Sequence, residues 1–249
     1  MWWYGLSPEE EPDEAEAESF APSDTSRSQP TTWTAADAVK GIFSAIGLIV
    51  IATIVVIAVT DVSDSVLALV TTVVLDILLV GVALRFTIWK YKLPWSALGF
   101  RRLGLDQARW ALPAGLFTSL VVAFAYAAII EAVGVDQGVG ATSELDELAP
   151  GMLAGLVFMI VIGAPMAEEV FFRGFLYTGL RQHLGFKGAA IVASAIFAMA
   201  HIHPLTYLPI FLIGIILTWV YSQTGSLVAP MLVHAAYNGV IVALFFAFS

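Results

Sequence analysis

Three short segments in the second half of the chain carry polar residues whose types and spacing could support acid–base chemistry. The first reads Glu-Glu-Val-Phe-Phe-Arg at 168–173, the second Phe-Ala-Met-Ala-His at 197–201 and the third His-Ala-Ala-Tyr-Asn at 234–238. Each segment lies inside a long apolar run. Ionisable groups are costly to place within a membrane, so each one is a functional-site candidate.

The first segment separates two glutamates by role. Glu169 and Arg173 are four residues apart, with the acid first, which is the favoured order for an ion pair on a helix. Glu168 points about 100° away around the same helix and has no local cation. We therefore expect Glu169 and Arg173 to support the structure, and Glu168 to be a spare carboxylate that can act as a general base.

The other two segments supply imidazoles with neighbours one helical turn away. Phe197 can pack beside His201 and exclude water from it, because the two residues are four apart. His234 and Asn238 share one helix face by the same spacing. Asn238 could orient the imidazole or donate a hydrogen bond to a developing oxyanion.

The elements that must position these residues are apolar throughout. Of the 249 residues, 59% are hydrophobic and only 12% are charged, with a mean hydropathy of +0.87. Soluble domains carry roughly 25% charged residues. The apolar runs are long and continuous, which favours helices over the alternating strands of a barrel. The sequence predicts an all-α, polytopic transmembrane helical bundle of about seven spans.

The expected spans follow from runs of about 20 apolar residues, the length that crosses the bilayer core. A domain over residues 36–249 holds them, and its polar signature occupies about 150–242. The spans are placed at about 39–60, 66–89, 110–130, 151–177, 188–203, 205–221 and 227–248.

Charge is distributed unevenly along the chain. Residues 1–40 hold nine acids and two bases, and we expect residues 1–35 to be a disordered acidic tail without a signal peptide. Five basic residues lie between the second and third spans, which predicts a cytoplasmic loop there and a cytoplasmic tail. They are Lys90, Lys92, Arg101, Arg102 and Arg109. The chain has no cysteine, so disulfides and thiolate chemistry are excluded.

Taken together, the three segments resemble the signature of the CPBP family of intramembrane proteases, which includes the type II CAAX prenyl proteases. That signature is Glu-Glu-x-x-x-Arg, then Phe-x-x-x-His, then His-x-x-x-Asn. The Thr-Gly-Ser-Leu-Val-Ala-Pro run at 224–230 is also similar to the family. Each segment alone is weak, but three in the right order on separate hydrophobic spans are a strong signal.

The resemblance implies an endopeptidase that hydrolyses a peptide bond of a membrane-associated substrate, a prenylated CAAX-type peptide being one candidate. It assigns Glu168 and His201 to activation of the attacking water, and His234 and Asn238 to the oxyanion side. A metalloprotease is the alternative, because Glu168, His201 and His234 could bind Zn²⁺ and leave a fourth position for water. Metal-free, glutamate-activated water is favoured, since a His-Glu-x-x-His helix and cysteines are absent.

Other readings of the same residues stay open. The two glutamates could only tie their helix to its neighbours, or the polar cluster could serve a non-enzymatic carrier or scaffold, as in bacteriocin immunity. Asp76 and Arg85 lie in the second span and are assigned no chemistry. The expected partners are the lipid bilayer of the cell membrane and a membrane-embedded or lipid-modified substrate, with no nucleic acid.

Overall fold

The computed structural model describes residues 33–59, 64–134, 148–201 and 204–248, and these residues form helices joined by short connections. The tail predicted over residues 1–35 falls almost wholly outside this part of the chain and stays a prediction. The elements are α2 (Ala35–Val59), α3 (Asp64–Leu84), η2 (Arg85–Trp89), η3 (Trp95–Leu98), α4 (Leu105–Val133), α6 (Pro150–Phe158), η4 (Met159–Gly163), α7 (Ala164–Glu169), η5 (Val170–Tyr177), α8 (Thr178–Ala200), η6 (Pro204–Thr206), α9 (Tyr207–Thr224) and α10 (Val228–Phe248).

The all-α membrane fold predicted from the sequence is confirmed. In the described residues, six helical stretches are long and apolar enough to cross a membrane. One of them, Pro150–Ala200, has 51 residues, which would extend about 76 Å as a single helix. Gly185 interrupts it with φ 64° and ψ −175°, a backbone region that glycine enters readily. The fourth and fifth predicted spans lie on either side of this break.

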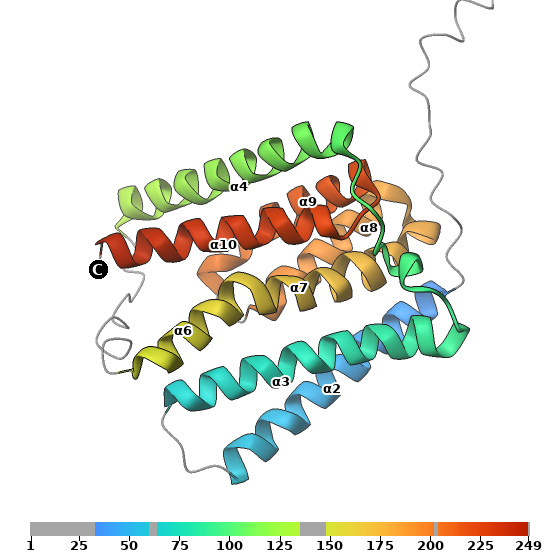
Figure 1. Ribbon diagram of the computed structural model, residues 1–249, viewed down its shortest axis with the longest axis horizontal. Helices are drawn as coiled ribbons and strands as arrows, with labels where there is room; N and C mark the ends of the chain where they lie inside the picture. Colours follow the sequence, from blue (N-terminus) through green and yellow to red (C-terminus); the bar gives the residue numbers. More distant parts are fainter. Residues whose placement is uncertain (1–32, 60–63, 135–147, 202–203, 249) are drawn as a thin grey trace, which may run out of the picture.

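The helices lie side by side, and the stretch from α6 to η5 passes between α10 and α3 (Figure 1). On one side α10 packs against α4 and α9, and on the other side α3 packs against α2. Helix α7, which carries both glutamates of the first segment, contacts α3 and α10. The first polar segment therefore lies in the interior of the bundle.

The outward surfaces are apolar, as lipid exposure requires. On α2, Phe43 is 71% exposed and Ile51 61%, and Phe117 on α4 is 70% exposed. Isolated exposed apolar residues are ordinary in soluble proteins, but whole helix faces of this kind indicate a hydrocarbon solvent. The bundle is an integral, multi-pass membrane protein.

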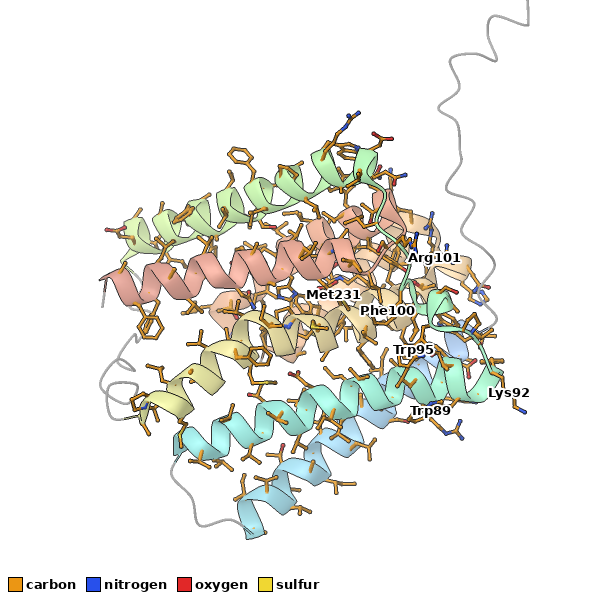
Figure 2. The ribbon with its side chains drawn as sticks, viewed as in Figure 1. Trp89, Lys92, Trp95, Phe100, Arg101 and Met231 are labelled. Carbon is orange, nitrogen blue, oxygen red and sulfur yellow. The ribbon has the colours of Figure 1, made fainter. Side chains whose placement is uncertain are left out.

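Basic and aromatic side chains mark one end of the bundle. Trp89, Lys92, Trp95 and Arg101 lie there together (Figure 2). Trp89 is 59% exposed and Trp95 55%, which is typical of side chains at a membrane–water interface.

Near this end of the bundle, Asp37 connects the start of α2 to the residues that follow η2. Its carboxylate accepts hydrogen bonds from Lys90 Nζ at 2.5 Å and from the Tyr91 hydroxyl at 2.6 Å. The hydrogen bond to Asp37, with a smaller contribution from Tyr91, raises the pKa of the Lys90 ammonium. This contact fixes α2 beside α3, which faces the candidate site.

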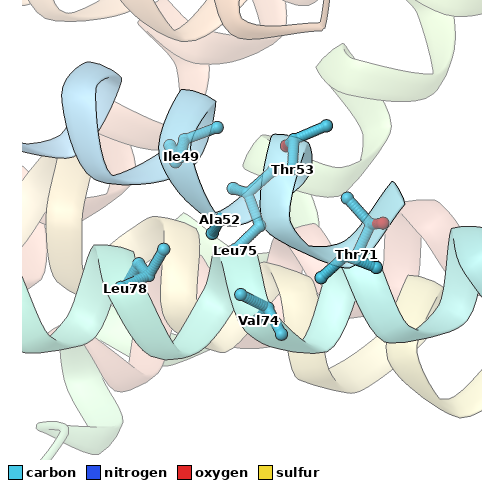
Figure 3. A pocket seen from close by; sticks show the side chains of 8 residues that line it. Ile49, Ala52, Thr53, Thr71, Val74, Leu75 and Leu78 are labelled. Carbon is cyan, nitrogen blue, oxygen red and sulfur yellow. The ribbon is translucent and has the colours of Figure 1, made fainter. Parts of the chain in front are cut away.

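A mainly apolar pocket lies between the second half of α2 and the middle of α3 (Figure 3). Its lining contains none of the residues predicted to do chemistry. The lining residues are Ile49, Ala52, Thr53, Val56, Thr71, Val74, Leu75 and Leu78.

Candidate functional site

Glu169 and Arg173 form the buried ion pair that their spacing predicts. Arg173 Nη1 donates to Glu169 Oε1 at 2.7 Å, and the two side chains are 1% and 0% exposed. Arg173 Nη2 also donates to the carbonyl of Gly214 in α9 at 3.1 Å. A buried ion pair is tolerated only when its remaining groups are satisfied, and the Gly214 carbonyl provides part of that satisfaction. The pair therefore links α7 and η5 to α9.

His234 of α10 lies between the two glutamates. Its Nδ1 is 2.9 Å from Glu169 Oε1, and its Nε2 is 3.8 Å from Glu168 Oε2. Because Glu169 accepts a hydrogen bond from Arg173 on the same oxygen, it acts as an ionised acceptor, so His234 Nδ1 carries the proton that it donates. Glu169 thus fixes the ring with its Nε2 turned towards Glu168. The sequence did not predict this contact between the first and third segments.

Glu168 differs from its neighbour in access and in partners. Its side chain is 20% exposed whereas that of Glu169 is 0% exposed. Among the described residues it forms no ion pair with lysine or arginine. The distance of 3.8 Å to His234 is too long for a direct hydrogen bond. Glu168 is therefore an accessible carboxylate beside an imidazole.

Phe197 of α8 joins the two histidines through its ring. The ring centroid lies 4.9 Å from that of His201 and 5.9 Å from that of His234, both in edge-to-face geometry. The Arg173 guanidinium lies 4.6 Å from the same ring. Phe197 is 1% exposed and so excludes water from the inner side of both imidazoles.

His201 is the most open of the predicted site residues. It caps the C-terminal end of α8, and its Nδ1 lies 2.9 Å from the Phe197 carbonyl oxygen. A carbonyl only accepts, so Nδ1–H donates and Nε2 is left free. In the described part of the chain His201 forms no hydrogen bond or ion pair with Glu168. The structure brings Glu168, Glu169 and His234 together. His201 is connected to this group only through the Phe197 ring, which contacts both histidines.

Asn238 has a hydrogen-bond partner that the π-helical stretch η4 leaves without a donor. In η4 the amide of Ala164 donates to Met159 five residues back, and the next residue, Pro165, has no N–H. The Ile160 carbonyl therefore has no donor within its helix. Asn238 Nδ2 donates to it at 2.8 Å and joins α10 to η4.

Asp76 is a further acid beside the site, and its charge interacts with that of Glu168. It lies on α3 and is 9% exposed. In the sequence Asp76 is visible as an isolated acid near the middle of an apolar span, without a partner that would assign it a role.

The alternative of a zinc site formed by Glu168, His201 and His234 requires a specific geometry. Zinc is held by three or four protein ligands at about 2.0–2.3 Å. Among the residues that the structure describes, no three His, Cys, Asp or Glu side chains gather closely enough for this. The described residues therefore give the metalloprotease interpretation no support. The preference for metal-free water stays a prediction.

A bundle of apolar helices that encloses two glutamates, an arginine and a histidine defines a multi-pass membrane protein with a polar intramembrane site. Residues 150–240 match the family model described as type II CAAX prenyl endopeptidase Rce1-like. This region carries an Rce1-like domain, and the family resemblance drawn from the three segments is confirmed for it.

The chain is similar to several curated membrane proteins. It is 29% identical over 160 residues to the membrane-embedded CAAX protease MroQ of Staphylococcus aureus, covering 61% of this chain and 58% of MroQ. It is 29% identical over 82 residues to the UPF0177 protein YxdF of Lactococcus lactis, covering 32% of this chain and 45% of YxdF. The chain thus spans about half the length of these relatives. No solved structure matches it at a significant level.

Proposed function

We propose that this protein is an intramembrane endopeptidase that uses a glutamate-activated water. The observation that carries the proposal is the chain of contacts from Arg173 through Glu169 to His234, which ends at the accessible carboxylate of Glu168. The match of residues 150–240 to the Rce1-like family supports a protease role for this region.

In the proposed mechanism Glu168 is the general base. It removes a proton from water as the water oxygen attacks the scissile carbonyl carbon, and it later returns that proton to the leaving amine. His201 has a free Nε2 and is proposed to hold the same water. The reaction thus consumes only water and the peptide: the water oxygen and one of its protons end in the product acid, and the other proton ends on the amine.

The proposed partner of the base is His234. Glu169 aligns its ring, and its Nε2 lies on the side of Glu168. Because Nδ1 already carries a proton, donation from Nε2 to the oxyanion that develops on the carbonyl requires the imidazolium form of His234. Asn238 already donates to Ile160, so we propose that it acts mainly by holding α10 against η4.

The substrate proposed is a peptide that is membrane-embedded or carries a lipid, with a prenylated CAAX-type C-terminus as one case. The exposed apolar faces would let such a substrate reach the bundle from the lipid. A non-enzymatic carrier remains the competing function. It requires polar groups arranged along a pore, whereas Glu168, Glu169 and His234 are gathered at one place.

The test is cleavage of a quenched peptide library by the full chain in detergent. We expect Glu168→Gln and His201→Ala to lose at least a hundredfold in rate while their thermal unfolding stays like that of the native chain. Ser119→Ala on α4 is the matched control and should cleave normally. A chelator should leave native cleavage unchanged. Equal cleavage by Glu168→Gln would show that this residue is not the base.

A further inference from the structure

A buried carboxyl group on α3 lacks the partners that burial demands. Asp76 is 9% exposed, and its Oδ2 has no hydrogen-bond partner in the part of the chain that the structure describes. An unsatisfied buried polar atom costs about 1–3 kcal/mol, and more when it is charged. Such an atom is therefore retained only where something else satisfies or uses it.

The position of Asp76 directs this group towards the candidate site. Helix α3 packs against α7, which carries Glu168, and against η4. A Cβ built on Gly163, at the end of η4, would lie 3.8 Å from Asp76 Oδ2. The two acids therefore lie on helices that pack against each other, and Asp76 Oδ2 is close to the end of η4, which leads directly into α7.

The cations of the site are not available to Asp76. Arg173 is committed to Glu169 and to the Gly214 carbonyl, and His234 Nδ1 is committed to Glu169. Two acids on adjacent helices that lack a lysine or arginine partner among the described residues are best satisfied by a molecule that can donate to both. Water has two O–H groups and commonly satisfies buried polar atoms in this way.

We propose that Asp76 is a further catalytic residue, whose Oδ2 accepts a hydrogen bond from the hydrolytic water that Glu168 activates. This inference rests on the proposed function and adds a second carboxylate to it. One O–H of the water gives its proton to Glu168 during attack. The other O–H stays bonded to Asp76, which turns an oxygen lone pair towards the scissile carbonyl carbon. The second proton remains on the oxygen in the product acid.

The first experiment compares Asp76→Asn with the native chain. The variant keeps the side chain's shape but removes its charge and replaces one of the two carboxylate oxygens with an NH2 group, which can donate to the water and cannot accept from it. We expect kcat to fall about tenfold to a hundredfold with an unchanged KM, because a misoriented water affects the chemical step and not substrate binding. Ser119→Ala, another buried polar group whose Oγ has no partner among the described residues, is the matched control. It should retain native kcat.

A second experiment separates this role from a structural one. The Glu168→Asp variant retains a weakened base. In this background Asp76→Asn should lower kcat by a much smaller factor than it does in the native chain, because both residues act on one water. The inference would be overturned if Asp76→Asn lowered kcat by the same factor in both backgrounds, or if it left kcat at the native value. The proposed function would still stand. If the native chain cleaves nothing, both fall. Should Asp76→Asn unfold, the apolar Asp76→Leu replaces it in the same comparison.

Discussion

At the scale of single residues, the ion pair of Glu169 and Arg173 shows how one motif can carry two duties. Its charges neutralise each other within the bundle, and its carboxylate also aligns His234. Glu169 Oε2 is buried without a hydrogen-bond partner in the described residues. The carboxylate therefore depends on the hydrogen bonds that its other oxygen, Oε1, accepts from Arg173 and His234. Removing one member should be much worse than removing both.

We predict that Arg173→Met lowers the free energy of unfolding by about 3–5 kcal/mol, because the Glu169 carboxylate is left buried and uncompensated. The double variant Glu169→Gln with Arg173→Met should recover part of this loss, since a neutral amide needs no cation. Thermal or denaturant unfolding in detergent measures both. The control Arg109→Met should change little, as Arg109 and its partner Asp106 are 77% and 92% exposed. A double variant no more stable than Arg173→Met would contradict the argument.

Helical spacing was sufficient to predict the contacts inside the first two motifs, but not the partner of Asn238 in the third. The ion pair of Glu169 with Arg173 and the packing of Phe197 on His201 follow from a spacing of four residues, and both are present. The contact of Glu169 with His234 joins residues 65 positions apart. It depends on how α7 and α10 pack, and helical periodicity carries no information on that. The roles assigned to Glu168, His201, His234 and Asn238 stay predictions.

At the scale of elements, the π-helical stretches alter which backbone groups need outside partners. A residue bonded five positions back instead of four leaves a carbonyl without its usual donor. At Ile160 the following Pro165 removes the only other candidate in the helix, and Asn238 takes its place. Pro165 is visible in the sequence, but the shift of register that precedes it is not. This explains why sequence reasoning considered Asn238 only beside His234.

We predict that Asn238→Ala lowers the free energy of unfolding by about 1–2 kcal/mol, because the Ile160 carbonyl loses its donor. In a Pro165→Ala background the loss should be smaller, since residue 165 then has an N–H that can reach Ile160. Unfolding in detergent of the two single variants and the double variant measures this difference. Additive losses would mean that the proline does not create the need for Asn238.

At the scale of the whole molecule, the number of spans was harder to predict than the fold class. Composition alone requires a helical bundle, and the structure is one. The sequence predicts seven spans, whereas the described residues contain six apolar stretches, because the fourth and fifth predicted spans belong to one helical stretch that Gly185 interrupts. The interruption lies within the polar residues 178–187, between the two predicted spans, so the two counts differ only in how this boundary is treated.

The distribution of charge also predicts how the whole bundle is oriented, and α4 offers a direct test. Gln107 and Glu131 are exposed near its two ends and are separated by about 36 Å along the helix. Gln107 follows the basic residues of the loop after η2, which the positive-inside rule places in the cytoplasm. The tail should lie on the same side, because two spans separate it from that loop.

Because the chain contains no cysteine, single cysteines can report this orientation without background. We predict that Glu131→Cys reacts with a membrane-impermeant maleimide in intact cells, while Gln107→Cys and Ser7→Cys react only after the cells are permeabilised. The physical reason is that moving the basic loop between α3 and α4 across the membrane is unfavourable. This fixes the start of α4 in the cytoplasm and its end on the opposite side. Labelling of Gln107→Cys in intact cells would reverse the orientation. Labelling of Ser7→Cys together with Glu131→Cys would instead mean that an odd number of spans separates the tail from the basic loop, and would remove α2 or α3 from the set of membrane-crossing helices.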